Sequence, residues 1–268
     1  MDKKWRLIKD GPAQGDWNMA VDQALLLGAE DDPAASPVLR FYSWARPTLS
    51  IGRLQKTDGL NLGYLAAEAI PIVRRPTGGR ALLHHQEVTY SVTLPEQCAL
   101  YGSLEQVYGR VTAALALALG MLGVEADGHD GAGQSEAYSF SDACFATRLG
   151  HEISVLGRKV AAGAQRRLRR SAMQHGSILL AVDGERSLDC VVWPDPQKRR
   201  LAAGAMAGLW DLAGEKIGAD RVADNVIEAF GRLHGVEFEP SRLSSGEEAR
   251  ARMIIGKERE TPRMSTAI

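Results

Sequence analysis

Short apolar runs of strand length alternate with longer stretches of helical periodicity, and they do so without a regular strand–helix–strand repeat. The clearest strand is Val88–Leu94, where β-branched and aromatic residues alternate with polar ones before Pro95. A capping-box pattern at Ser103–Gln106 then opens a helix that extends to about Leu122. This irregular mixture predicts an α+β (mixed α/β) fold in which helices back a mixed β-sheet.

Other segments fit the same interpretation. We expect a helix over Asp16–Ala29, with Asp16 as its N-cap, because apolar residues recur there at helical spacing. Charge rises and periodicity fades after Ser244, so residues 1–243 are expected to form one domain and residues 244–268 a C-terminal helix or tail. The remaining expected elements are helices at Asn61–Ala69 and Val222–Leu233, strands at Val38–Trp44, Thr48–Ile51, Ile72–Arg75 and Ser177–Val182, and a hairpin of Glu152–Val155 with Lys159–Ala161.

The charge balance and the cysteine count exclude several classes of protein. Among the 268 residues, 32 are Lys or Arg and 33 are Asp or Glu, so no global basic field favours nucleic acid or an anionic membrane. The longest apolar run, Ala113–Leu119, is far shorter than the ~18 residues needed to cross a bilayer. No secretory signal follows the charged start, and the three cysteines form neither a disulfide framework nor a zinc motif. We therefore expect a cytoplasmic protein without a nucleic-acid or membrane partner.

A first chemical signal lies between Arg74 and Ser91. The paired Gly78 and Gly79 follow a strand and let backbone N–H groups approach a ligand, while nearby arginines add positive charge. An acyl carbonyl or a phosphate would suit such a loop, and an ordinary hairpin turn with solvated arginines is the alternative. His84 and His85 are adjacent in a strand, where successive side chains point to opposite faces, so a shared metal ion is not expected.

A second signal extends from Cys144 to Gln165. With turns near Gly150 and Gly157 the segment could form a meander, placing Cys144 and Lys159 on either side of a central strand about 10 Å apart. A neighbouring ammonium lowers the pKa of a thiol and favours the nucleophilic thiolate. The alternative is a buried, inert cysteine and a surface lysine.

A third signal is the arginine-rich Arg166–Arg170 followed by His175-Gly176. The arginines could receive an acidic partner or a phosphate, and a solvated basic loop is an equal alternative. His175 could face a site or be a satisfied structural residue.

Together these segments resemble the lipoate–biotin protein ligase superfamily, and within it the protein octanoyltransferases of the branch common in Gram-positive bacteria. The resemblance is carried by the block at Arg74–Ser91, by Cys144 with Gly157–Gln165, and by Gln174–Leu180. It implies a lipoate/biotin ligase-like catalytic domain, whose curved mixed sheet is backed by helices and holds an acyl chain in a narrow tunnel.

The resemblance also implies a reaction. Members of this branch move octanoyl from octanoyl-acyl carrier protein to a lipoyl-domain lysine, typically that of glycine cleavage H protein, through a cysteine thioester. Cys144 is then the nucleophile, and Lys159 keeps it ionised and hydrogen-bonds the acyl carbonyl. No cofactor and no metal are expected. The residues implied to bind the substrate are Arg75, Gly78, Gly79 and His84, with Gly163 and His175 opposite.

Two other functions stay open. One is an ATP-dependent lipoate–protein ligase, in which Lys159 and the Arg75–Gly79 loop would hold an adenylate. The presence of Cys144 weighs against it. The other is a non-catalytic member that binds lipoyl domains or acyl ligands without turnover.

Overall fold

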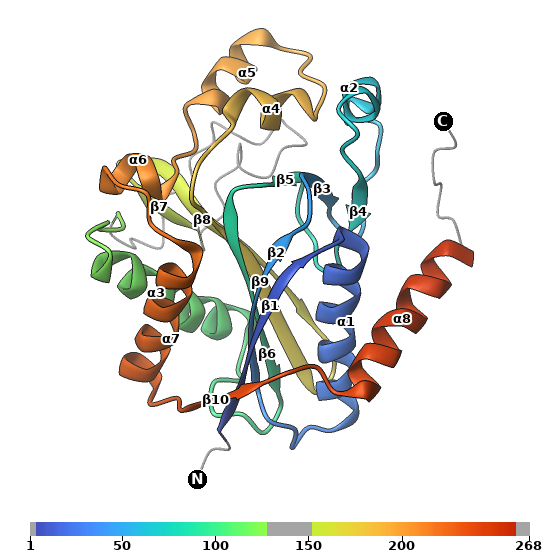
Figure 1. Ribbon diagram of the computed structural model, residues 1–268, viewed down its shortest axis with the longest axis vertical. Helices are drawn as coiled ribbons and strands as arrows, with labels where there is room; N and C mark the ends of the chain where they lie inside the picture. The colour runs from blue at the N-terminus through green and yellow to red at the C-terminus, as the bar shows by residue number, and fades with distance from the viewer. Residues whose placement is uncertain (1–3, 128–151, 261–268) are drawn as a thin grey trace.

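The computed structural model describes residues 4–127 and 152–260, within which seven strands form one mixed sheet (Figure 1). The strand order is β10-β1-β2-β6-β9-β8-β7, parallel between β10, β1 and β2 and antiparallel elsewhere. This confirms the predicted α+β class. The strands are β1 (Trp5–Ala13), β2 (Val38–Trp44), β6 (Glu87–Pro95), β7 (Ile153–Val155), β8 (Arg158–Arg167), β9 (Ser171–Leu179) and β10 (Phe238–Ser241).

Helices cover both faces of this sheet (Figure 1). On one face lie α3 (Leu104–Met121) and α7 (Ala219–His234), and on the other α1 (Gly15–Asp31) with α8 (Ser245–Glu260) packed against it. The predicted capping box is present, because Ser103 and Gln106 bond each other's backbone N–H. The expected N-cap at Asp16 is wrong, since α1 begins at Gly15 with Gln14 as its N-cap and Asp16 lies in the first turn.

The alternating sequence of β6 gives the sheet one apolar and one polar face. Val88, Tyr90 and Val92 belong to the main core, together with apolar residues of α3 and α7. Thr89 and Ser91 point the other way and hydrogen-bond buried carboxylates there. The polar face is therefore the one on which a site can form.

A smaller sheet of β3 (Thr48–Ile51), β4 (Ile72–Arg74) and β5 (Leu82–His84) lies beside this polar face, with β3 in the centre. The loop between β4 and β5 lines the cavity described below. Its own core includes residues of α2 (Leu62–Ala67), which lies within the helix expected over Asn61–Ala69 and is capped by Asn61. The remaining helices are α4 (Gly184–Asp189), α5 (Pro196–Ala203) and α6 (Leu209–Ala213).

The strand expected over Ser177–Val182 is displaced. β9 begins at Ser171 and ends at Leu179, and the expected basic loop is the end of β8 with a tight turn in which the Leu168 N–H donates to the Ser171 carbonyl. The first half of β9 carries Gln174 and His175, whose polar side chains hide its strand character from hydropathy. By contrast, the hairpin of β7 and β8 forms as predicted around Leu156 and Gly157, both with positive φ.

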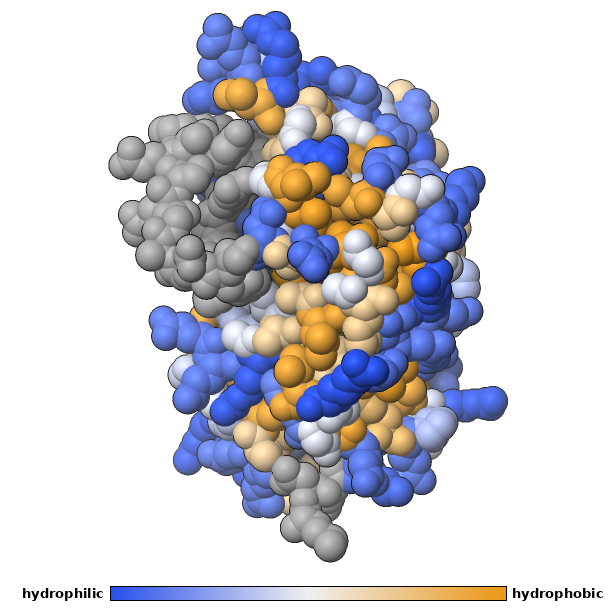
Figure 2. Space-filling view, turned by 90° about the vertical axis from the view of Figure 1, so that its left-hand side faces the viewer, coloured by the Kyte–Doolittle hydropathy of each residue, from blue (hydrophilic) through white to orange (hydrophobic). Residues whose placement is uncertain are grey.

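Figure 2 shows the side that carries α3, α6 and α7, where apolar side chains gather along the middle and hydrophilic ones surround them. Large hydrophobic residues that remain exposed come from separate elements, among them Leu104, Leu201 and Leu233. In the described parts of the chain, no helix is both long and apolar enough to cross a bilayer.

Candidate active site

One cavity of about 300 Å³ lies between the polar face of the large sheet and the loops of the small one. This volume is at the lower end of the range of ~300–1,000 Å³ that is usual for small-ligand sites. All six residues that the resemblance assigns to substrate binding line it: Arg75, Gly78, Gly79, His84, Gly163 and His175.

The glycine loop between β4 and β5 is held in place by Arg75. This guanidinium is 6% exposed and donates to the carbonyls of Gly78 (3.0 Å) and Arg80 (2.7 Å) and to the Ser50 hydroxyl (3.1 Å). Gly79 has a φ of +96°, which favours glycine. A Cβ on Gly52 would lie only 2.0 Å from the Gly79 carbonyl oxygen, so the two loops touch. For Arg75, the alternative of a solvated arginine is therefore wrong.

His84 forms one end of a buried polar cluster. Its Nδ1 hydrogen-bonds the Glu87 carboxylate (2.7 Å), its Nε2 hydrogen-bonds the Ser50 hydroxyl (2.8 Å), and its ring stacks on Trp44 at 3.9 Å between centroids. Burial raises the pKa of Glu87, but the charge and hydrogen bond of His84 outweigh burial and leave that pKa below its ordinary value. His85 is exposed and lies just after the end of β5 rather than within a strand.

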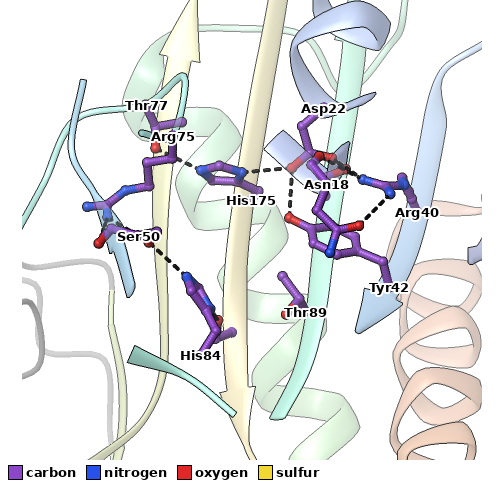
Figure 3. Close-up of polar contacts among 12 residues, drawn as sticks. Asn18, Asp22, Arg40, Tyr42, Ser50, Arg75, Thr77, His84, Thr89 and His175 are labelled. Carbon is purple, nitrogen blue, oxygen red and sulfur yellow. Dashed lines mark hydrogen bonds and ion pairs between the residues drawn. The ribbon is translucent and has the colours of Figure 1, made fainter. Parts of the chain in front are cut away.

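His175 forms a second carboxylate–imidazole pair in the same cavity (Figure 3). Its Nδ1 donates to Asp22 (2.9 Å), and its Nε2 accepts from the Thr77 hydroxyl (2.7 Å). Burial lowers the pKa of His175 more than Asp22 raises it, so the ring is neutral at neutral pH. The Thr77 contact joins this pair to the glycine loop.

Asp22 is fully buried and anchors this network. It also accepts hydrogen bonds from Arg40 (2.8 Å), Tyr42 (2.8 Å) and Ser91 (2.9 Å). Burial raises the pKa of Asp22, but the His175 hydrogen bond and the Arg40 charge outweigh it, and the pKa lies below its ordinary value. A charged carboxylate thus fixes the tautomer of His175.

Glycines at two paired positions make room for a tyrosine under the cavity. Gly163 and Gly176 are partners across β8 and β9. A Cβ would lie 2.9 Å from the Tyr90 hydroxyl at Gly163 and 2.7 Å from it at Gly176. A side chain at either position would displace this floor of the cavity.

Lys159 is buried rather than on the surface. Its side chain is 2% exposed, and its Nζ lies 2.6 Å from a carboxylate oxygen of Glu152, which lines the cavity. The predicted nucleophile Cys144 lies outside the described residues, as does the Gly150 turn. The predicted Cys144–Lys159 contact therefore stays a prediction.

The other two cysteines carry no sign of a site. Cys190 is buried, its thiol donates to the Arg186 carbonyl, and burial raises its pKa to about 12. Cys98 is half-buried against the main core. Within residues 4–127 and 152–260, no group of three or more His, Cys, Asp or Glu is placed to hold a metal.

Sequence reasoning missed several polar residues of this site. Arg40 and Tyr42 alternate in β2 with core residues, and this alternation marks a polar sheet face. Asp22, a charged residue within an apolar helical stretch, was a comparable signal. No sequence signal distinguished Glu152, because an acidic residue before a short strand is common.

Comparison with known proteins places this chain in a family. The lipoyl protein ligase A/B catalytic domain matches residues 14–231. Octanoyltransferase LipM of Moorella thermoacetica is 35% identical over 94% of each chain, and that of Kyrpidia tusciae is 36% identical over 94% of this chain and 95% of its own.

Solved structures show the same fold. Lipoate-protein ligase A bound with ATP superposes with a TM-score of 0.79 at 20% identity over 97% of both chains. The bipartite lipoate protein ligase of Thermoplasma acidophilum gives 0.79 at 20% identity, over 98% of this chain and 99% of its own. The chain thus belongs to the lipoyl protein ligase A/B catalytic domain family.

Proposed function

We propose that this chain transfers an octanoyl group from a carrier thioester to a protein lysine through an intermediate on Cys144. Octanoyl transfer in lipoate biosynthesis follows from relatives of that activity aligned over nearly the whole chain, and it makes the chain an acyltransferase. The observation that best supports the proposed site is that all six expected residues line one cavity, which Glu152, the ion-pair partner of Lys159, also lines.

In the proposed mechanism, the Cys144 thiolate attacks the donor thioester, and the bond from the acyl carbon to the donor sulfur breaks. The donor leaves as a thiolate and takes up the proton that Cys144 released when it ionised. Half-ionising an ordinary thiol at pH 7 takes ~2 kcal/mol. An ammonium 4 Å away supplies up to ~4 kcal/mol at an effective dielectric constant of ~20, so Lys159 is sufficient for this role. Burying the six methylenes of an octanoyl chain adds ~5 kcal/mol of binding.

The finer assignments belong to the same proposal. The donor is octanoyl-acyl carrier protein, the acceptor is the lipoyl-domain lysine of glycine cleavage H protein or a similar domain, and the reaction takes place in the cytoplasm. Arg75 and Gly79 support the cavity wall that meets the donor, and Gly163 and His175 form the opposite wall.

The test is intact-protein mass spectrometry after mixing the chain with octanoyl-acyl carrier protein in the absence of nucleotide. One octanoyl adduct should form on the wild type and on Cys98→Ser, and none on Cys144→Ser. Adding a lipoyl domain should then discharge the adduct. Modification that required free octanoate, ATP and Mg²⁺ would refute the transferase mechanism in favour of a ligase, and no adduct under any condition would indicate a non-catalytic binder.

A further inference from the structure

The cavity presents one acidic side chain among several basic and neutral ones. Of the described residues that line it, Glu152 is the only Asp or Glu, whereas Arg75, Arg80, His84 and His175 are basic or neutral. Its side chain is 10% exposed. A carboxylate at this position attracts a cation from the cavity.

The ion pair is oriented with its negative member toward the cavity. Glu152 precedes β7 and lines the cavity, while Lys159 on β8 is not among the lining residues and is 2% exposed. The strand register brings them together, because Lys159 is paired with Ser154, two residues after Glu152. A group that enters the cavity therefore meets the carboxylate before it meets the ammonium.

We propose that Glu152 binds the ε-ammonium of the acceptor lysine and takes its proton before acyl transfer. This inference rests on the proposed function, since it concerns the second half of that reaction. A lysine of ordinary pKa, about 10.4, is protonated at neutral pH and cannot attack a thioester until it loses a proton. A carboxylate offers about four lone-pair positions, so Glu152 can hold a second ammonium while it keeps Lys159.

The step balances with groups that the proposed reaction already contains. The lysine nitrogen forms a bond to the acyl carbon, and the bond from that carbon to the Cys144 sulfur breaks. Of the two protons that the nitrogen loses, Glu152 takes the first and passes it to water. The second goes to the departing sulfur, so that Cys144 is regenerated as a thiol.

The experiment separates the two half-reactions in Glu152→Gln. Formation of the octanoyl adduct from octanoyl-acyl carrier protein is followed by rapid mixing and intact mass, and its discharge is then started with either a lipoyl domain or hydroxylamine. Hydroxylamine is uncharged at neutral pH and needs no proton acceptor before it attacks. We expect Glu152→Gln to form the adduct, to discharge it to the lipoyl domain at least ~100-fold more slowly than wild type, and to discharge it to hydroxylamine at the wild-type rate.

Other outcomes overturn the inference. If adduct formation and both discharges slow together, Glu152 serves only to position Lys159. If the lipoyl domain and hydroxylamine are affected equally, Glu152 has no role in recognising the ammonium. Should Glu152→Gln not fold, Glu152→Asp, which keeps the charge on a shorter side chain, must show the same selective loss with the lipoyl domain. Failure of the wild type to form any adduct refutes the proposed function instead.

Discussion

The floor of the cavity can be tested through the space that Gly163 and Gly176 leave for Tyr90. In Gly163→Ala the new Cβ meets the Tyr90 hydroxyl at 2.9 Å and the His175 carbonyl at 3.2 Å, whereas in Gly176→Ala the closest atom is the Ala162 carbonyl oxygen at 2.2 Å. Overpacking of this kind costs ~1–3 kcal/mol of unfolding free energy. The loss in Gly176→Ala should lie at the upper end of this range, since the Ala162 carbonyl oxygen is held in the sheet and cannot rotate away.

Removing the tyrosine hydroxyl should separate the two cases. Tyr90→Phe alone costs ~1 kcal/mol, because Tyr90 loses its hydrogen bond with Gln174. In a double-mutant cycle, Gly163→Ala with Tyr90→Phe should be less destabilised than the sum of the single variants by ~1 kcal/mol. Gly176→Ala should show much less coupling, because its backbone clash remains. Urea unfolding curves provide the four free energies for each cycle.

The cycle can also refute this reasoning. Additive effects for Gly163→Ala and Tyr90→Phe would mean that the hydroxyl does not limit the space at Gly163. Equal coupling at both glycines would mean that the sheet shifts as a unit to relieve either contact. The octanoyl-transfer rate of each variant at a temperature where it is folded would then show whether the cavity floor matters beyond stability.

Two further residues give separate tests. Asp22→Asn should lower the free energy of unfolding by ~3–5 kcal/mol, as judged by thermal denaturation, because the buried Arg40 loses a carboxylate partner. Arg40 also pairs with Asp10, at 2.7 Å, and a loss below ~1 kcal/mol would mean that Asp10 alone balances the charge. The pKa of Asp22 is lower in the folded protein than in the unfolded chain, so the charged carboxylate adds to the free energy of unfolding. This contribution is complete above the ordinary pKa of about 3.9 and is lost as the pH falls through the lower pKa of the folded protein. Wild type and Asp22→Asn should therefore converge in stability in acid. Gly79→Ala should raise the KM for the donor about tenfold, since its positive φ and a Cβ 2.5 Å from Arg75 Nη2 cost over 1 kcal/mol. Gly78→Ala, whose Cβ meets nothing within 4 Å, should keep the wild-type KM.

The parts of the fold that could be predicted are those with a local signal. The strand of β6 follows from its alternation, the start of α3 from its capping box, and the β7–β8 hairpin from Leu156-Gly157. The six residues that line the cavity could be predicted through the resemblance to a known family, because they lie in its sequence motifs. Hydrophobic periodicity alone does not identify them.

The remainder depends on contacts between distant residues. Arg40 is a charged residue within a strand whose partner Asp22 lies 18 positions earlier on a helix, so neither explains the other until the sheet is folded. The role of Glu152 likewise could not be predicted, because only the register of β7 and β8 brings Lys159 next to it. The predicted bounds of β9 were wrong because its side chains that face the cavity are polar. Polar residues at a site interrupt the hydropathy pattern by which a buried strand is predicted.

The first and last elements of the described chain pack against each other, and this affects how the chain folds during synthesis. β10 is the outer neighbour of β1, with Trp5 beside Phe238, and α8 packs on α1. At a translation rate of ~5–20 residues per second, the N-terminal strand and helix wait roughly ten to fifty seconds after emerging from the ribosome before those partners are made. Until then their apolar surface is exposed, so we expect nascent chains stalled before residue 238 to be captured by chaperones and released once the last helix is complete.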